Sequence, residues 1–376
     1  MVTIYLPFTL SRLTFCPGWI FCPVVWWSCF ALILSSLPDT VFSLGRCPVE
    51  SATVLTAGRF FADSSDQILV EERLGEVALV SVLSKKPVRV GVFRLVLLQD
   101  GKRGFAPVWR SGVMLEPRTV ALGVASEVAT IGDFDLDGNS ELIFVGADTC
   151  RVLRWGEGER RFFLPSEGVS GAVWADVDGD TFPELVTLEE VFDSLGSEQL
   201  VKVWRPEGTT MVRQGAPVKV AFEDKTVRFT LLGAARLEDY PGMPVILMAE
   251  EARVKPGIYG VIFAPVRDSF VLSFLPFPYQ DWFSKEAVLP AGRLQLFNVG
   301  DTLVAYGFFV PGSRPGGPAK SFAVLQDGEW RLLRLRESAR RLAGPVCRFW
   351  YRGQEGWLEL RDNLFYFYPG ELFYWR

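Results

Sequence analysis

The feature of this sequence that most constrains its fold is an acidic motif that occurs twice within a short stretch of chain. Residues 131–145 read IGDFDLDGNSELIFV, and residues 174–188 read WADVDGDTFPELVTL. Both stretches contain the pattern Asp-x-Asp-x-Asp-x-x-x-Glu and continue directly into an apolar run. A repeated pattern of this kind indicates a chain built from copies of one supersecondary unit, in which a turn joins two strands.

Weaker copies extend the repeat over the rest of the chain. Residues 57–70 align with the first motif without a gap and keep its glycine, its aromatic residue and its apolar run, but only Asp63 among the acids. Degenerate copies follow at residues 233–248, 292–305 and 344–360. After each copy come two apolar or aromatic runs joined by a turn rich in Asp, Glu, Pro and Gly, which predicts a β-hairpin. The six hairpins are predicted at residues 95–109, 152–164, 201–212, 259–272, 322–333 and 364–375.

One turn-linked strand pair and one hairpin make four strands in about 55 residues, which is the size of one propeller blade. We therefore predict an all-β fold: a six-bladed β-propeller of four-stranded antiparallel blades over residues 46–376, preceded by an N-terminal hydrophobic leader. Closing the blades into a ring would also remove exposed sheet edges. A seventh blade stays open as an alternative, because the interval between the first two copies (Gly58 to Gly132) is longer than the others.

Each acidic turn carries the ligand types that a hard cation prefers, namely carboxylate and main-chain carbonyl oxygens. In the first turn, three carboxylates stand at alternate positions, Gly138 permits a sharp bend and Glu141 can close the site. Carboxylates clustered without a cation would repel one another, which disfavours the alternative of a bare solvated turn. An EF-hand is disfavoured because a strand-like run follows each motif where that site needs a helix. The predicted ligands are Asp133, Asp135, Asp137, Asn139 and Glu141 in one site and Asp176, Asp178, Asp180, Phe182 and Glu184 in the other, with Asn139 and Phe182 marking the main-chain carbonyls.

The same residues resemble a known repeat family. The pattern Gly-Asp-Phe-Asp-x-Asp-Gly-Asn-x-Glu-Leu is similar to the FG-GAP or VCBS repeat of integrin α-chain propellers and many secreted bacterial proteins. The resemblance is strong for residues 131–145 and 174–188, fair for 57–70 and weak for the last three copies. It implies a propeller in which each motif joins the two inner strands of a blade and its loop holds Ca²⁺. Glu141 and Glu184 replace the usual closing Asp, and the other four copies lack the acids, so two Ca²⁺ sites are expected.

The first 45 residues differ from the rest of the chain. No charged residue occurs between Arg12 and Asp39. One basic residue before an apolar core, followed by small residues near Gly45, resembles a secretory signal that is cleaved after Gly45. The alternative is an uncleaved membrane anchor through residues 13–38, and a misassigned start codon is the third interpretation. Signal and anchor both predict an exported protein, periplasmic, extracellular or membrane-anchored, with residues 46–376 outside the cytoplasm.

Three of the six cysteines lie in the leader, and the other three are Cys47, Cys150 and Cys347. Three scattered cysteines allow at most one bridge. In a six-membered ring, Cys47 and Cys347 would fall in the first and last blades, which are neighbours, and a disulfide between them would close the ring. The alternative is that all three are buried thiols that pack as small apolar residues.

Composition narrows the function. The chain has no histidine, which excludes Ser-His-Asp and Cys-His catalysis and HExxH zinc sites. A net charge of −5 argues against a nucleic-acid partner. We predict a Ca²⁺-binding module for adhesion, ligand recognition or scaffolding, with a protein or carbohydrate ligand on the propeller surface. Two alternatives remain: a polysaccharide-active lyase or hydrolase that uses Arg, Lys, Tyr or carboxylates, and a cell-envelope assembly protein.

Overall fold

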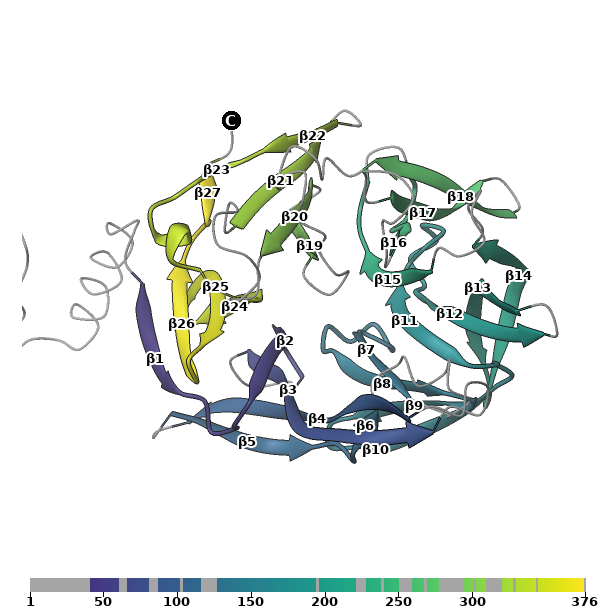
Figure 1. Ribbon diagram of the computed structural model, residues 1–376, viewed down its shortest axis with the longest axis horizontal. Coiled ribbons are helices and arrows are strands. Elements are labelled where there is room, and N and C mark those ends of the chain that lie inside the picture. The colour runs from purple at the N-terminus through teal and green to yellow at the C-terminus, as the bar shows by residue number, and fades with distance from the viewer. Residues whose placement is uncertain are drawn as a thin grey trace, which may run out of the picture. The chain divides into compact units, whose positions relative to one another are not determined.

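The structure is a computed structural model that describes residues 41–60, 66–80, 87–101, 104–115, 127–193, 196–220, 228–237, 240–249, 259–266, 269–276, 294–299, 302–308, 320–326, 329–342 and 344–374. These ranges are almost entirely antiparallel β-structure, with one short 3-10 turn at Ser338–Arg341 and no α-helix (Figure 1). The predicted all-β class is therefore confirmed for the described residues. Within these ranges, no helix has the length and apolar character needed to cross a membrane.

The described strands form six runs of four, which we number sheets 1 to 6 in chain order. In each of sheets 1 to 5, strands that follow one another in the chain pair with one another. Sheets 2 and 3 are also joined at their edges by one parallel pair, Phe163 with Thr210. Sheet 1 contains β2 (Ala52–Gly58), β3 (Gln67–Val80), β4 (Pro87–Gly101) and β5 (Gly104–Arg110), with β6 (Met114–Leu115) paired to β4. Sheet 2 contains β7 (Val128–Gly132), β8 (Glu141–Gly146), β9 (Asp148–Arg154) and β10 (Gly158–Leu164).

The same order continues through the later sheets. Sheet 3 contains β11 (Val169–Ala175), β12 (Glu184–Asp193), β13 (Gly196–Glu207) and β14 (Thr210–Val220). Sheet 4 contains β15 (Phe229–Ala234), β16 (Val245–Ala249), β17 (Tyr259–Val266) and β18 (Ser269–Pro276), and sheet 5 contains β19 (Leu294–Val299), β20 (Thr302–Phe308), β21 (Lys320–Gln326) and β22 (Glu329–Leu332). Sheet 6 contains β24 (Val346–Tyr351), β25 (Gln354–Arg361) and β26 (Leu364–Pro369), while β23 (Arg334–Leu335) pairs with β27 (Phe373–Tyr374).

The fourth strand of sheet 6 comes from the other end of the described chain. This strand, β1 (Phe42–Arg46), pairs antiparallel with β26, with Phe42 opposite Phe367 and Arg46 opposite Leu364. Figure 1 shows the purple β1 beside the yellow β26. Residues 42–45, which the sequence assigned to the leader, are therefore part of a sheet. Pairing with β26 gives their main-chain N–H and C=O groups hydrogen-bond partners. Residues 1–40 lie outside the described ranges.

The cysteines follow the alternative of buried thiols. Cys47, Cys150 and Cys347 are all buried and free, so the expected Cys47–Cys347 disulfide is not formed in the structure. Burial raises the pKa of all three thiols, that of Cys150 to about 12. In place of a bridge, the first strand of the described chain is linked to β26, near its other end, through the hydrogen bonds of the β1–β26 ladder.

Apolar side chains fill the spaces between neighbouring sheets. Val54 and Val70 of sheet 1 pack in one buried cluster with Phe349, Leu358 and Phe367 of sheet 6. Neighbouring sheets also touch through their first strands: β7 contacts β11, β11 contacts β15, β15 contacts β19 and β2 contacts β24. In these four pairs of sheets the first strand of one therefore lies against the first strand of the other, which holds the turns that leave these strands close to the adjacent sheet.

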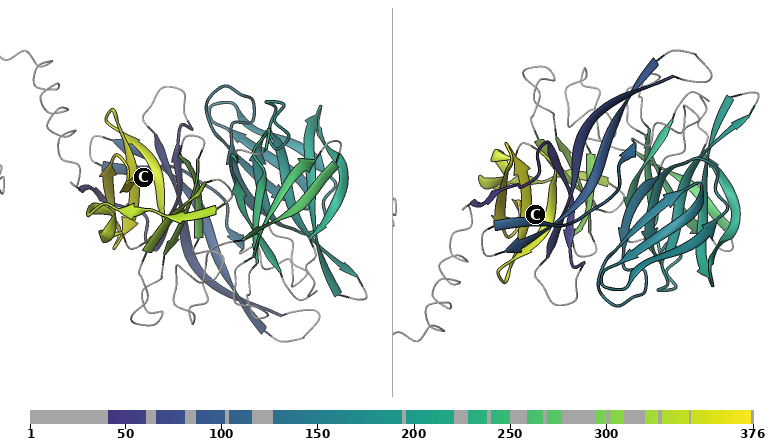
Figure 2. Two further views of the ribbon diagram at one scale, coloured as in Figure 1. Left: turned by 90° about the horizontal axis from the view of Figure 1, so that it is seen from above. Right: turned by 90° about the horizontal axis from the view of Figure 1, so that it is seen from below.

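Two features vary on this common pattern. In sheet 1, β3 and β4 are 14 and 15 residues long and extend past the neighbouring strands in both side views (Figure 2). In sheet 6, the first two strands are joined by a tight turn, in which Arg352 and Gly353 both have positive φ, and not by a long loop. Two positive φ values in a two-residue turn are the geometry that suits the twist of a hairpin. The acidic loops belong to sheets 2 and 3, which keep the longer connection.

Candidate metal-binding loops

The first acidic loop joins β7 to β8, at the end of the ladder that pairs Gly132 with Glu141. Asp133 organises this loop, because its Oδ1 accepts the main-chain N–H of Asp137 at 3.0 Å and its Oδ2 accepts that of Gly138 at 2.9 Å. Asp residues favour such bonds to main-chain N–H groups a few positions on, which is why they initiate turns. Leu136 and Gly138 complete the bend with positive φ values of 62° and 87°.

Glu141 lies at the end of the first loop, where β8 begins. Its side chain is buried, and Oε2 accepts the main-chain N–H of Phe134 at 2.7 Å. Burial raises the pKa of Glu141 to about 7; the negative charges of Asp135, Asp137 and Asp133 act in the same direction, while the bond from Phe134 opposes them. A carboxyl with this pKa is partly protonated at neutral pH, and a cation in the loop would favour its ionised form.

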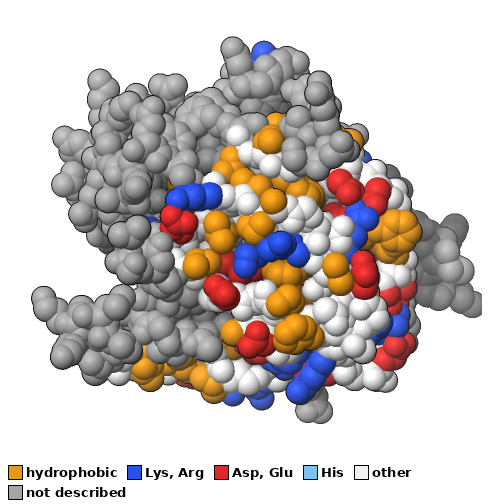
Figure 3. Space-filling model, turned by 90° about the vertical axis from the view of Figure 1, so that its right-hand side faces the viewer, with side chains coloured by type: hydrophobic (Ala, Val, Ile, Leu, Met, Phe, Trp, Pro, Cys, Tyr) orange, Lys and Arg blue, Asp and Glu red, His pale blue; other side chains and the backbone are white. Residues whose placement is uncertain are grey.

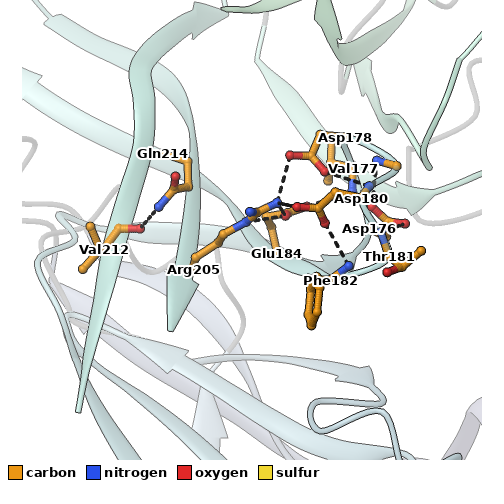
Figure 4. Close-up of polar contacts among 11 residues, drawn as sticks. Asp176, Val177, Asp178, Asp180, Thr181, Phe182, Glu184, Arg205, Val212 and Gln214 are labelled. Atoms are coloured by element: carbon orange, nitrogen blue, oxygen red, sulfur yellow. Dashed lines mark hydrogen bonds and ion pairs between the residues drawn. The ribbon is translucent and has the colours of Figure 1, made fainter. Parts of the chain in front are cut away.

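The second acidic loop joins β11 to β12 and repeats the same arrangement (Figure 4). Asp176 Oδ1 accepts the N–H of Gly179 at 2.7 Å, and its Oδ2 accepts that of Thr181 at 3.1 Å. The buried Glu184 closes the loop by accepting the N–H of Val177 at 2.9 Å. Two loops of different sequence thus use the same side-chain positions to hold the same kind of turn.

The structure brings together three carboxylates in each loop. One oxygen each from Asp133, Asp135 and Glu141 lie within 4.8 Å of one another, and so do one oxygen each from Asp176, Asp178 and Glu184. These six residues are among the predicted ligands. Two further predicted ligands, Asp137 and Asp180, also contact an arginine of the next hairpin. Asn139 and Phe182 lie in the loops as predicted, where their main-chain N–H groups bond to Asp137 and Asp180.

Sequence reasoning missed one residue in each loop, an arginine on the third strand of the sheet. Arg154, at the end of β9, contacts Asp135 and lies 3.0 Å from Asp137 through the same nitrogen, Nη2. Its other terminal nitrogen, Nη1, lies 2.7 Å from Glu157. The hydrogen bond to Asp137 is the largest cause that raises the pKa of Arg154, so this guanidinium stays charged.

Arg205, on β13, reaches deeper into the second loop. Its Nη2 lies 2.9 Å from Asp178 and 2.7 Å from Asp180. The same nitrogen contacts the buried Glu184, to which Nε also donates at 2.7 Å (Figure 4). The pKa of Glu184 is raised, because the effect of burial exceeds that of the hydrogen bonds from Val177 and Arg205, which lower it. The guanidinium therefore places positive charge among the carboxylates of the candidate site.

The strand register shows that the two arginines are equivalent. In sheet 2, Leu142 is opposite Leu153, so one position further along the ladder Glu141 lies across from Arg154. In sheet 3, Leu185 is opposite Trp204, so Glu184 lies across from Arg205 in the same way. The signal in the sequence was an arginine in the hairpin after each acidic motif. The hairpin between β12 and β13 is longer than the one between β8 and β9, so the two arginines do not align by spacing along the chain.

The weaker copy in sheet 1 shows what is retained where the full acidic pattern is missing. Gln67 takes the place of the closing Glu, is fully buried, and accepts the N–H of Phe60 at 2.8 Å through Oε1. The position next to it across the ladder, which holds arginine in sheets 2 and 3, is Gln99, because Ile68 is opposite Leu98. Asp63 lies outside the described residues.

Each loop is also fastened to the neighbouring sheet through a carbonyl at its first position. The carbonyl of Arg59 accepts the N–H of Ser140 at 2.6 Å, and that of Asp133 accepts the indole N–H of Trp174 at 3.1 Å. The carbonyl of Asp176 accepts the N–H of Met243 at 2.7 Å. The acidic loops therefore lie between sheets, and whatever orders them also orders the contacts between sheets.

The donor set suits a hard divalent cation. Both trios consist of carboxylate oxygens alone, which is the ligand chemistry of Ca²⁺ and Mg²⁺ and not that of softer metals. A guanidinium already lies against each set as a stand-in cation.

No protein-family model matches the sequence, and a search of the curated proteins finds no significant match.

Proposed function

We propose that this chain is an exported six-bladed β-propeller that binds Ca²⁺ through two acidic loops and acts as a binding or scaffold module. Six runs of four antiparallel strands support the blade count, and contacts between the first strands of neighbouring sheets support their arrangement as blades. The β1–β26 ladder would close such a ring, since it completes the last sheet with the first strand.

The observation that carries the metal proposal is the repeated trio of carboxylates. Asp133, Asp135 and Glu141 would supply ligands in the first loop, as Asp176, Asp178 and Glu184 would in the second. Ca²⁺ takes six to eight oxygen ligands, so main-chain carbonyls and water would complete each shell. The bound ion would neutralise the loop, and the chain's own residues would transmit the resulting order to the adjacent sheet through Trp174 and Met243.

A role in binding follows from what the loops support. The side chains around each trio hold turns and link sheets, which is a structural use of a cation. Figure 3 shows Lys, Arg, Asp and Glu side chains interspersed with hydrophobic ones on one face, a mixed surface that suits a protein or carbohydrate ligand. Export, which the leader predicts, would place the loops where Ca²⁺ is abundant.

Calorimetric titration of the metal-stripped full chain with Ca²⁺ tests this proposal. We expect two sites, loss of one in Asp133→Ala/Asp135→Ala and loss of the other in Asp176→Ala/Asp178→Ala. Glu207→Ala, which removes an exposed carboxylate from the β13–β14 turn, should keep both. Ca²⁺ at about 100 times its Kd should raise the free energy of unfolding by about 2.7 kcal/mol per site. No binding heat together with identical melting curves in Ca²⁺ and chelator would contradict it.

A further inference from the structure

We infer that Arg154 and Arg205 are built-in counter-cations that compete with a divalent cation and thereby set its affinity at the two acidic loops. This inference rests on the proposed function, because it concerns the regulation of the same two sites. Both guanidinium groups contact carboxylates that would have to turn their oxygens toward a metal ion. A monovalent charge in that place stabilises the loop without metal and repels an incoming cation.

Arg205 shows the competition most directly. It contacts Asp178 and Glu184, two of the three residues whose oxygens converge in the second loop, and also Asp180. Glu184 Oε2 is already engaged by the N–H of Val177, and Oε1 is the oxygen that Arg205 occupies. A metal ion that uses Oε1 must therefore displace the guanidinium or lie beside its charge.

Arg154 is held less tightly to its loop. Within the convergent trio its contact is with Asp135, and its other terminal nitrogen pairs with Glu157, outside the loop. Arg154 can therefore keep its ion pair with Glu157 when a metal ion binds the carboxylates of the loop. We therefore expect the first loop to bind a divalent cation more tightly than the second.

The chain contains its own control for this pairing. Three sheets share the closing position at the end of the first ladder, where Gln67, Glu141 and Glu184 stand opposite Gly58, Gly132 and Ala175. The position next to it on the third strand is arginine in the two sheets whose loop has the full Asp-x-Asp-x-Asp-x-x-x-Glu pattern, and Gln99 in sheet 1, whose loop lacks that pattern and has glutamine at the closing position. The arginine thus accompanies the full acidic pattern with its closing Glu and not the turn itself, which is what a counter-charge for that set of carboxylates requires.

The experiment measures Ca²⁺ affinity by calorimetry in the full chain and in Arg205→Met and Arg154→Met, which keep an unbranched stem but lose the charge. We expect each variant to bind Ca²⁺ about tenfold more tightly at one site, the effect of removing one opposing charge next to partly exposed carboxylates. The matched control is Arg213→Met, which removes an exposed arginine from β14 and should change neither site. Metal-free melting should show both loop variants destabilised relative to this control.

The outcomes separate the inference from the function on which it rests. Equal or weaker binding in the arginine variants, with two sites in the unchanged protein, overturns the inference and leaves the Ca²⁺ proposal standing. Binding in the variants alone supports the inference and overturns the proposal for the unchanged protein, while no binding in any form overturns both. Should the arginine variants fail to fold, the two affinities are read from Asp133→Ala/Asp135→Ala and Asp176→Ala/Asp178→Ala. A second loop that binds as tightly as the first then overturns the inference.

Discussion

Gln67 accepts the main-chain N–H of Phe60 at 2.8 Å, as the side chain at the corresponding position of the first acidic loop does at 2.7 Å. One of these side chains is a neutral amide and the other, Glu141, is a carboxyl. The bond is therefore common to both positions, and the charge is an addition found where the loop has the full Asp-x-Asp-x-Asp pattern. This separation of roles makes the function of the closing residue testable.

Glu141→Gln should fold normally and lose metal affinity, because an amide oxygen can still accept the Phe134 N–H but carries no charge. Glu141→Ala should lose metal affinity and also stability, since it leaves the partly buried N–H of Phe134 without its acceptor, at a cost of up to about 1–3 kcal/mol. Denaturant unfolding in metal-stripped buffer measures the stability of each variant, and Ca²⁺ calorimetry measures its metal affinity. Equal stability of the two variants would show that the bond from Phe134 does not hold the loop.

The raised pKa of Glu141 predicts a pH dependence of stability in the absence of metal. The native state holds the proton up to a pKa of about 7, whereas an unfolded Glu loses it near its ordinary value of 4.5. The native state thus binds more protons between these values, so the contribution of Glu141 to stability is complete below pH 4.5 and is lost as the pH rises toward 7. Melting curves at pH 5 and 7.5 should show this decrease, and Glu141→Gln should reduce it. An unchanged difference in Glu141→Gln would assign the effect to other groups.

Gly132 should not tolerate a side chain. A Cβ at this position would lie 2.2 Å from Cδ1 of Trp174, the residue whose indole bonds to the first loop. We expect Gly132→Ala to lower the free energy of unfolding by about 1–3 kcal/mol through overpacking. Gly112→Ala is the matched control, because a Cβ there meets no atom within 4 Å. The Trp174→Ala background tests the clash: if Gly132→Ala lowers the free energy of unfolding as much there as in the unchanged protein, the clash with Trp174 is not the cause.

Removal of β1 should destabilise the last sheet. A chain that begins at residue 47 leaves the β26 edge unpaired and removes Phe42 and Leu44 from the cluster that sheets 1 and 6 share. We expect a loss of at least about 2 kcal/mol from the apolar burial alone, and self-association through the open edge. A chain that begins at residue 41 is the control. Equal melting temperatures and equal monomer fractions for the two chains would contradict this role of β1.

The sequence was sufficient to predict most of the strands and the carboxylates, because both follow local rules. The hairpin predicted at residues 364–375 is wrong, because β26 pairs with β25 and β1 while β27 pairs with β23. Alternating apolar runs and repeated Asp positions are visible within one motif, and the structure confirms strands on both sides of Asp133 and Asp176. Arg154 and Arg205 were missed because their place depends on how far each hairpin extends before it returns. The end of the leader was misjudged for a similar reason: Phe42–Arg46 forms a strand only through β26, a partner that local sequence does not reveal.

The β1–β26 ladder has a consequence for biogenesis. A ribosome makes β1 first among the described strands, but the strand that it pairs with emerges only after the strands of sheets 1 to 5 have been synthesised. Every other four-stranded run can pair as its own strands appear, whereas this one must wait for contact between the two ends of the domain, the slowest kind of contact to form. Until then β1 is an unsatisfied edge able to join a strand of another molecule. Slow completion of this one ladder should therefore govern both the refolding rate of the protein and its tendency to aggregate while it folds.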